Sequence, residues 1–259
     1  MAQRVSKKKR PSREKHMMKE QLVIEEGVFD NRTMMRIEKL FTHKIISKLL
    51  FIIAKGKEGD VYLADAGEDI KRDYVAVKIF RIETSKFYSR VDYMIGDPRF
   101  PKIKKSIFWI VNEWCKKEYG NLKIAEDAKV HAPKPYYFNG NVLALEFIGN
   151  AERVAPQLRF VQLEEPKEVL KIILSDIKKL YKNELVHADI SEYNILMKDG
   201  TPYIIDFGQA VIDKHPNAMM FLKRDIFNIT SYFRRKYRFE VDVDQVFDYV
   251  TGKIKTLSL

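Results

Sequence analysis

Two acids and one amide in the second half of the chain carry oxygens suited to metal binding or proton transfer. Asn194 follows Asp189 by five residues, and Asp206 follows Asn194 by twelve, at the start of Asp206-Phe207-Gly208. Such a set can place a hydroxyl or a water beside a nucleotide whose phosphates are neutralised by a divalent metal. Because phosphoryl transfer depends mainly on positioning and charge balance, the spacing predicts an ATP-using phosphotransferase or ATPase.

Each of these residues has an expected role. Asp189 would accept or orient the proton of the attacking group, while Asn194 and Asp206 would bind the metal that bridges the phosphates. Asp and Asn also favour turns and caps, which is the competing structural interpretation of each residue taken alone. His187, just before Asp189, is expected to hold the loop through a hydrogen bond rather than act as a base.

A glycine turn and a strand lysine precede this set in the first half of the chain. The turn Gly56-Lys57-Glu58-Gly59 can lay backbone N–H groups over phosphates. Lys78 ends Val75-Ala76-Val77-Lys78, a pattern typical of the lysine that holds α- and β-phosphates. Glu118 is its expected ion-pair partner, and Glu113 on the same predicted helix is the competitor.

The elements that must position these residues follow from periodicity and turn residues. Three strands around the glycine turn predict an antiparallel meander, and a hairpin with Asn139-Gly140-Asn141 at its turn follows a long helix. A second hairpin carries Asn194 and Asp206 at its outer ends. The predicted strands cover 45–54, 61–64, 74–80, 136–138, 142–145, 195–197 and 203–205, and the predicted helices begin near residues 31, 106, 166, 217 and 243 and end near 41, 124, 182, 236 and 256.

Composition indicates an intracellular globular protein. The 259 residues carry a net charge of +11, and no apolar run is long enough to span a bilayer. The N-terminus is basic without an apolar segment, so we expect no secretory signal, no membrane and a cytoplasmic location. A single cysteine, Cys115, excludes an internal disulfide. The basic clusters lie at 7–10, 102–105 and 234–238 and could contact an RNA partner, but composition alone favours a solvated surface.

The motifs together resemble the RIO-type atypical protein kinases, and most closely the Rio-one subfamily in its compact archaeal form. The resemblance covers about residue 28 to the C-terminus and is carried by Val28 to Thr33, Gly56 to Glu58, Glu146 to Gly149 and Val186 to Asn194. It implies an α+β, two-lobed, protein-kinase-like fold with a β-meander N-lobe and a truncated, mostly helical C-lobe. We therefore divide the chain into a basic tail (1–27), an N-lobe with a helical extension (28–148) and a C-lobe (149–259).

The resemblance also implies activity, cofactors and partners. ATP with Mg²⁺, or Mn²⁺ in its place, would bind between the lobes, and ATP hydrolysis or self-phosphorylation would control association with maturing small ribosomal subunits and their rRNA. Asp206 would accept a phosphate as an aspartyl-phosphate. Ser106 is a second candidate acceptor, or simply a helix N-cap. The nucleotide-binding residues implied by the resemblance are Gly56, Lys57, Glu58, Val61, Lys78, Glu118, Glu146 and Ile148.

Two other functions fit parts of the pattern. A small-molecule kinase of the aminoglycoside type shares the acid, amide and later acid, but the 51 residues after Gly208 are short and basic where such enzymes carry an acidic pocket. A ribosome- or RNA-binding scaffold that uses ATP as a switch, with little turnover, is the third hypothesis. The same short C-lobe disfavours a broad peptide kinase.

Overall fold

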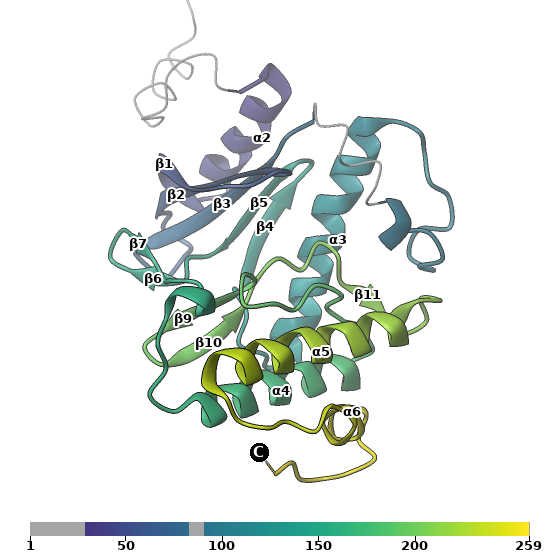
Figure 1. Cartoon of the computed structure of the whole chain (residues 1–259). Helices are drawn as coiled ribbons and strands as arrows, with labels where there is room; N and C mark the ends of the chain where they lie inside the picture. Colours follow the sequence, from purple (N-terminus) through teal and green to yellow (C-terminus); the bar gives the residue numbers. More distant parts are fainter. Residues whose placement is uncertain (1–28, 83–90, 259) are drawn as a thin grey trace, which may run out of the picture.

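The computed structural model describes residues 29–82 and 91–258, and shows the expected two-lobed α+β arrangement (Figure 1). The basic tail, including the cluster at 7–10, lies outside the described residues. In Figure 1 the sheet and helix α2 form the upper lobe, helices α4, α5 and α6 form the lower one, and the long helix α3 runs beside the sheet toward the lower helices.

The N-lobe is built on a five-stranded antiparallel sheet in the order β1-β2-β3-β5-β4. The predicted meander and the hairpin around Gly140 are both confirmed, and Gly140 supplies the positive φ of 60° that its turn requires. The strands are β1 (Ile46–Lys55), β2 (Gly59–Ala66), β3 (Tyr74–Phe80), β4 (Pro135–Asn139) and β5 (Val142–Glu146).

Two helices cover opposite faces of this sheet. Helix α2 (Asn31–Thr42) begins at Asp30, whose carboxylate accepts from the N–H groups of Arg32 (2.9 Å) and Thr33 (3.1 Å) as an N-cap. Helix α3 (Ile107–Asp127) follows Ser106, which occupies the cap position without forming a side-chain cap bond. Both helices lie where the hydrophobic periodicity predicted them.

The two-residue period of β3 divides its side chains between these helices. Val75, Val77 and Ile79 belong to the buried cluster under α2. Ala76 and Phe80 belong to the larger cluster that contains Trp114 of α3. Because alternate residues of a strand face opposite sides, Lys78 must share a face with Ala76 and Phe80. The strand pattern alone therefore directs the lysine toward α3.

The C-lobe combines the second hairpin with helices. The hairpin of β9 and β10 matches its prediction, as does α4, whose first residue is Pro166. The prediction of a last helix to residue 256 was wrong: α6 stops at Thr251, because Gly252 takes a left-handed φ of 84° that ends it. The helices are α4 (Pro166–Lys182), α5 (Ala218–Tyr237), α6 (Val243–Thr251) and the 3₁₀ turn η2 (Leu158–Phe160), and the strands are β9 (Ile195–Lys198) and β10 (Thr201–Ile204).

Two pairs of very short strands were not predicted. β6 (Gly149–Asn150) pairs with β7 (Arg153–Val154) directly after the sheet, at the predicted start of the C-lobe. β8 (Leu185–Val186) pairs with β11 (Val211–Ile212), with Val186 opposite Val211. Strands of two residues show no alternation, so no periodic signal announces them. The second pair matters most, because it joins the segment before Asp189 to the segment after Gly208.

None of the helices in residues 29–82 and 91–258 combines the length and apolar composition needed to cross a bilayer. The largest buried cluster instead runs through both lobes, from Leu63 of β2 through Trp114 of α3 to Ile173 of α4 and Phe233 of α5. The residues that could do chemistry are therefore mounted on elements that share one core.

Candidate active site

Lys78 lies at the centre of the predicted site and contacts two carboxylates. Its Nζ is 2.7 and 2.8 Å from the two carboxylate oxygens of Glu118 and 2.9 Å from Oδ1 of Asp206. The side chains of Lys78 and Glu118 are 13% and 1% exposed. Glu113 instead approaches Lys116 at 4.0 Å. The structure thus confirms Glu118 as the partner and rejects Glu113.

The charges around Lys78 favour its ionised form. Burial alone lowers the pKa of Lys78, but the carboxylates of Asp206, Glu118 and Glu58 outweigh it and raise that pKa well above its usual range. Burial also raises the pKa of Glu118 to about 7, against the lowering effect of Lys78. Two hydrogen bonds from the ammonium group to one carboxylate are charge-assisted, and we therefore treat the pair as ionised.

The glycine turn lies at the β1–β2 connection beside Lys78. Val61 of β2 stands directly opposite Lys78 of β3 in the sheet register. Gly56 N–H donates to the Gly59 carbonyl (2.9 Å), which closes the turn around the exposed Lys57. A Cβ atom at Gly59 would lie 2.1 Å from the Ile79 carbonyl oxygen, so close strand packing requires this glycine. The turn is thus fixed at the edge of the site, with Glu58 near Lys78.

Glu146 and Ile148 lie at the end of β5, where the sheet meets the C-lobe. The Glu146 carboxylate binds the Arg72 guanidinium (3.0 Å) and the Lys134 backbone N–H (3.3 Å). The Ile148 carbonyl accepts from the N–H of Ala155 (2.9 Å). The structure therefore places the two residues predicted to contact adenine at the junction of the sheet and the C-lobe.

Helix α5 holds the loop that carries Asp189 through hydrogen bonds to the loop backbone. Ala188 is fully buried with a left-handed φ of 64°, a conformation that costs an alanine about 1–2 kcal/mol. The Asp225 carboxylate accepts from the N–H groups of Ala188 (2.7 Å) and Ile190 (2.9 Å), and Arg224 donates to the Ala188 carbonyl. These bonds hold the strained turn that presents Asp189.

Asp225 was missed at the sequence level although a signal existed. It falls in phase with the buried residues Phe221, Leu222 and Ile229 of α5, so a carboxylate on that apolar face required a partner. Burial raises the pKa of Asp225 to about 7, whereas its two backbone donors and Arg224 lower it.

Asp189 and Asn194 contact each other within the loop. The Asn194 Nδ2 group donates to the Asp189 backbone carbonyl (2.9 Å) and to its Oδ2 (3.0 Å). Gln209, which the sequence did not single out, donates to the same Oδ2 (3.1 Å). The Asn194 carbonyl accepts from Ile205 N–H (2.9 Å), so the base of the β9–β10 hairpin places Asn194 beside the residue before Asp206.

The arrangement of donors fits a magnesium ion. Because Asn194 Nδ2 makes both bonds to Asp189, its amide oxygen faces the other way, available as a metal ligand. Among the described residues no three or more His, Cys, Asp or Glu side chains gather into a metal site. An amide oxygen and the Asp206 carboxylate, completed by phosphate oxygens, are the ligands that Mg²⁺ takes in nucleotide enzymes.

The segment Asp206-Phe207-Gly208 is fastened to α3 by two further residues that sequence reasoning missed. Lys117 Nζ donates to the carbonyls of Gly208 (2.8 Å) and Ala210 (2.5 Å). Asn121 Nδ2 donates to the carbonyls of Phe207 (2.8 Å) and Ala210 (2.9 Å). Burial lowers the pKa of Lys117 to about 7. The helix that holds Glu118 therefore also holds the backbone after Asp206.

His187 supports the same segment, as expected from its place in the motif. Its Nε2 lies 3.1 Å from the Ile205 carbonyl, and its ring meets the edge of Phe207 at a centroid distance of 4.7 Å. Burial lowers the pKa of His187 to about 4, so the ring is neutral at physiological pH and donates from Nε2.

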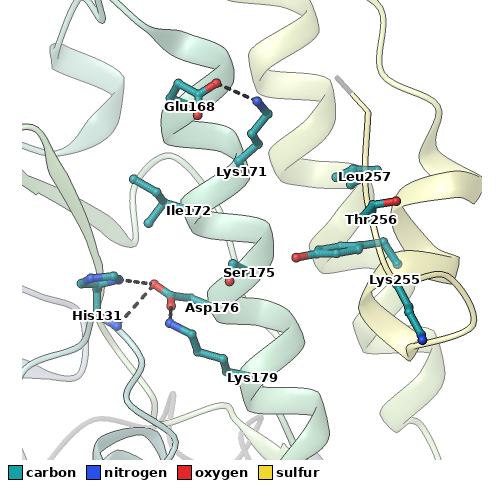
Figure 2. A pocket seen from close by; sticks show the side chains of 11 residues that line it. His131, Glu168, Lys171, Ile172, Ser175, Asp176, Lys179, Lys255, Thr256 and Leu257 are labelled. Carbon is teal, nitrogen blue, oxygen red and sulfur yellow. Dashed lines mark hydrogen bonds and ion pairs between the residues drawn. The ribbon is translucent and has the colours of Figure 1, made fainter.

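Two hollows in the described part of the chain contain none of the predicted site residues. One, of about 470 Å³, lies between α4 and the C-terminal segment (Figure 2). There the buried Asp176 accepts from Lys179 (2.6 Å) and pairs with His131 (2.7 Å), which ties α4 to the loop before β4. The other, of about 700 Å³, lies at the start of α2 against β2, β3 and Phe108.

Comparison with known proteins identifies the family. A family model described as the RIO domain matches residues 60–246. The chain is 39% identical over 233 residues to the RIO-type serine/threonine-protein kinase Rio1 of Haloferax volcanii, covering 90% of this chain and 79% of that protein. It is 41% identical over 227 residues to Rio1 of Methanocaldococcus jannaschii, covering 87% and 76%.

A solved structure shares the fold at lower identity. The Rio2 kinase of Chaetomium thermophilum, in an ADP/Mg²⁺-phosphoaspartate complex, superimposes with a TM-score of 0.65 at 22% identity over 90% of this chain and 72% of that one. Fold, site geometry and sequence relatives agree, and the chain therefore belongs to the RIO kinase family, with Rio1 serine/threonine-protein kinases among its relatives.

Proposed function

We propose that this chain is an ATP- and Mg²⁺-dependent kinase and ATPase that forms a phosphorylated state of itself. The observation that carries the proposal is the contact of Lys78 with both Glu118 and Asp206, at 2.7 and 2.9 Å. It joins the phosphate-holding lysine of the N-lobe to the metal-binding acid of the C-lobe. Kinase relatives imply ATP as the substrate.

Each residue has a defined task in this proposal. Lys78 holds the α- and β-phosphates, kept charged by Glu118 and oriented by β3. Asn194 and Asp206 hold the metal, which supplies neutralisation of the phosphate charge. Asp189 orients the attacking group and accepts its proton. The carbonyl of Glu146 and the N–H of Ile148 hold adenine, beneath Val61 of β2 and the turn that contains Gly56, Lys57 and Glu58.

We propose Asp206 as the phosphate acceptor. A carboxylate oxygen of Asp206 attacks the γ-phosphorus, the bond from that phosphorus to the β-phosphate oxygen breaks, and ADP leaves. Water, whose proton passes to Asp189, then attacks the same phosphorus. The bond from that phosphorus to the Asp206 oxygen breaks, phosphate leaves, and the carboxylate is restored with net hydrolysis of ATP. The Asp206 side chain is 36% exposed, so it is accessible to ATP and water. The phosphoaspartate complex of the Chaetomium thermophilum Rio2 kinase supports this choice. Ser106, exposed at the start of α3, is the alternative acceptor.

We propose the small ribosomal subunit as the partner, contacted through rRNA. Exposed basic side chains at 102, 104, 105, 234, 235 and 238 suit phosphate contacts. Lys236 does not belong to this group, because its Nζ donates to the carbonyls of Arg159 (3.2 Å) and Val161 (2.7 Å). Beside the Asp189 loop, the Arg159 guanidinium lies 4.6 and 4.4 Å from the exposed rings of Phe160 and Tyr193, a surface on which unstacked bases can pack.

Labelling with radioactive ATP tests the proposed activity. The protein is incubated with Mg²⁺ and γ-labelled ATP, with and without small ribosomal subunits, beside Asp189→Ala and Asp206→Asn. We expect label and phosphate release in the wild type and the loss of both in Asp206→Asn. Asp189→Ala should lose phosphate release, because the water that attacks the acyl-phosphate then has no base. A label that survives acid identifies serine, whereas one labile to acid and base identifies aspartate. Turnover unaffected by either substitution would refute the site.

Binding to subunits tests the partner. If exposed basic residues contact rRNA, the logarithm of the affinity falls steeply with the logarithm of salt concentration. An affinity that does not change with salt concentration would indicate that these residues form only a solvated surface. Membership of the RIO family leaves the small-molecule kinase without support. Subunit binding that responds to ATP while Asp189→Ala and wild type release phosphate equally slowly would favour the scaffold.

A further inference from the structure

We propose that Gln209 is a positioning residue for Asp189, holding its carboxylate in the orientation that receives the proton of the attacking group. This inference rests on the proposed function, in which Asp189 is the base. Gln209 lies outside the acid, amide and lysine pattern and takes no part in the assigned metal site.

Two N–H donors meet at a single oxygen of the Asp189 carboxylate. Gln209 Nε2 donates to Oδ2 at 3.1 Å, and Asn194 Nδ2 donates to the same atom at 3.0 Å. Rotation of a carboxylate about its last side-chain bond is otherwise only weakly restricted. Two donors converging from different segments fix that rotation, and so fix which oxygen faces the donors and which faces the site.

The β8–β11 pairing explains why Gln209 reaches Asp189. Val211 stands opposite Val186 in this antiparallel pair, which brings Gln209 level with Ala188, one residue before the base. The backbone on both sides of Gln209 is fastened. Ala210 N–H donates to the Phe207 carbonyl (3.2 Å) in a turn, and Lys117 and Asn121 hold the Ala210 carbonyl.

Gln209 and Asn194 are expected to have different roles. Asn194 offers its amide oxygen to the metal while its nitrogen contacts Asp189, so any shift of Asn194 toward the metal acts on the base as well. Gln209 approaches from the segment after Gly208 and gives Asp189 a second anchor that is independent of the amide ligand. A base held in this way keeps its orientation when the metal site fills.

Substitutions that change only the donor test the role. Gln209→Met keeps the length of the side chain and removes the N–H, while Gln209→Glu keeps the shape and places an acceptor against an acceptor. We expect kcat for ATP turnover to fall about ten-fold in the first and further in the second, with KM for ATP within about two-fold of wild type. Gln245→Met, the same change at an exposed position of α6, serves as the matched control and should leave kcat and the melting temperature unchanged.

A double-mutant cycle separates positioning from general structure. In an Asp189→Ala background, Gln209→Met should change the residual rate less than about two-fold, because the group it orients is gone. An undiminished ten-fold loss in that background, a fall in melting temperature that tracks the rate, or a wild-type rate in Gln209→Met would each overturn the inference. Turnover that depends on Asp189 but not on Gln209 defeats this inference alone, whereas wild-type protein without turnover defeats the proposed function and the inference together.

Discussion

At the scale of single residues, the site depends on one buried ammonium group shared by two acids. Lys78 contacts Glu118 from α3 and Asp206 from the C-lobe, so the position of its ammonium group depends on both carboxylates. A buried charge that loses its partner is costly, because the remaining charge is left in a medium of low polarity. The residues around Lys78 are therefore expected to respond sharply to small chemical changes.

Glu118→Gln tests the ion pair. The amide keeps the shape of the side chain but cannot balance the charge of Lys78, so the ammonium shifts toward Asp206 and away from the phosphates. We expect kcat/KM for ATP turnover to fall by about 10–100-fold, the range that misplacement of a positioned group produces. Glu113→Gln is the matched control on the same helix, and should stay within about two-fold of wild type. Equal losses in both variants would contradict the assignment of Glu118.

His187 makes a prediction about acid stability. Its folded pKa is about 4, below the ordinary 6.5, so the folded state binds fewer protons than the unfolded state between these values. The neutral ring therefore contributes fully to the free energy of unfolding above pH 6.5, and this contribution is lost as the pH falls toward 4. The loss amounts to about 3 kcal/mol, from 1.36 kcal/mol for each pKa unit.

The comparison with His187→Gln isolates this contribution. The pKa values of Asp225 and Glu118 are raised to about 7, which increases the free energy of unfolding as the pH falls, opposite to the effect of His187. Both carboxyl groups are present in the wild type and in the variant, so their effect cancels in the comparison. Between pH 7 and pH 4 the free energy of unfolding, measured with urea, should fall by about 3 kcal/mol more in the wild type than in the variant. Parallel curves for the two proteins would show that the ring is not held neutral.

At the scale of elements, α3 couples the two halves of the site. One face of this helix presents Glu118 to Lys78, while Lys117 and Asn121 hold the carbonyls that follow Asp206. Asn121 also accepts from Arg99 (2.7 Å), whose guanidinium is paired with the buried Asp97. A displacement of α3 would therefore disturb Lys78 and the segment Asp206-Phe207-Gly208 together.

Asn121→Leu tests this coupling. The change leaves the Phe207 carbonyl and the Arg99 guanidinium without their bonds to Asn121, and we expect a loss of about 2 kcal/mol in the free energy of unfolding. Asn112→Leu provides the control on the same helix, because the buried Asn112 Oδ1 has no hydrogen-bond partner among the described residues. It should leave stability unchanged or increase it. The prediction fails if the control is destabilised as much as Asn121→Leu.

Elements with a strong period were predictable, and contacts between distant segments were not. The alternation in β3 directed Lys78, and the glycine turns bounded the hairpins. Glu113 and Glu118 could not be separated from sequence, because the choice depends on which turn of α3 lies opposite Lys78. The role of Gln209 could not be predicted for a related reason. Its contact with Asp189 depends on β8 and β11, which have two residues each and therefore show no hydrophobic periodicity in the sequence.

At the scale of the whole molecule, the two lobes share one buried cluster. It extends from Leu63 in the sheet through Trp114 to Phe233 in α5, so the site lies on a continuous core rather than between two independent cores. A Cβ atom at Gly208 would lie 2.7 Å from the Trp114 indole nitrogen, which shows how closely the segment Asp206-Phe207-Gly208 packs on that core. The arrangement favours a site that is largely formed before ATP arrives.

Calorimetric titration of ATP with and without Mg²⁺ tests most directly whether Asp206 and Asn194 hold metal-bound phosphate beside Lys78. We expect Mg²⁺ to raise the affinity of the wild type for ATP by at least about ten-fold, or about 1.4 kcal/mol. In Asp206→Asn that gain should disappear, while ATP alone binds about as it does to the wild type. An equal gain from Mg²⁺ in wild type and Asp206→Asn would contradict the metal site on which the proposed function rests.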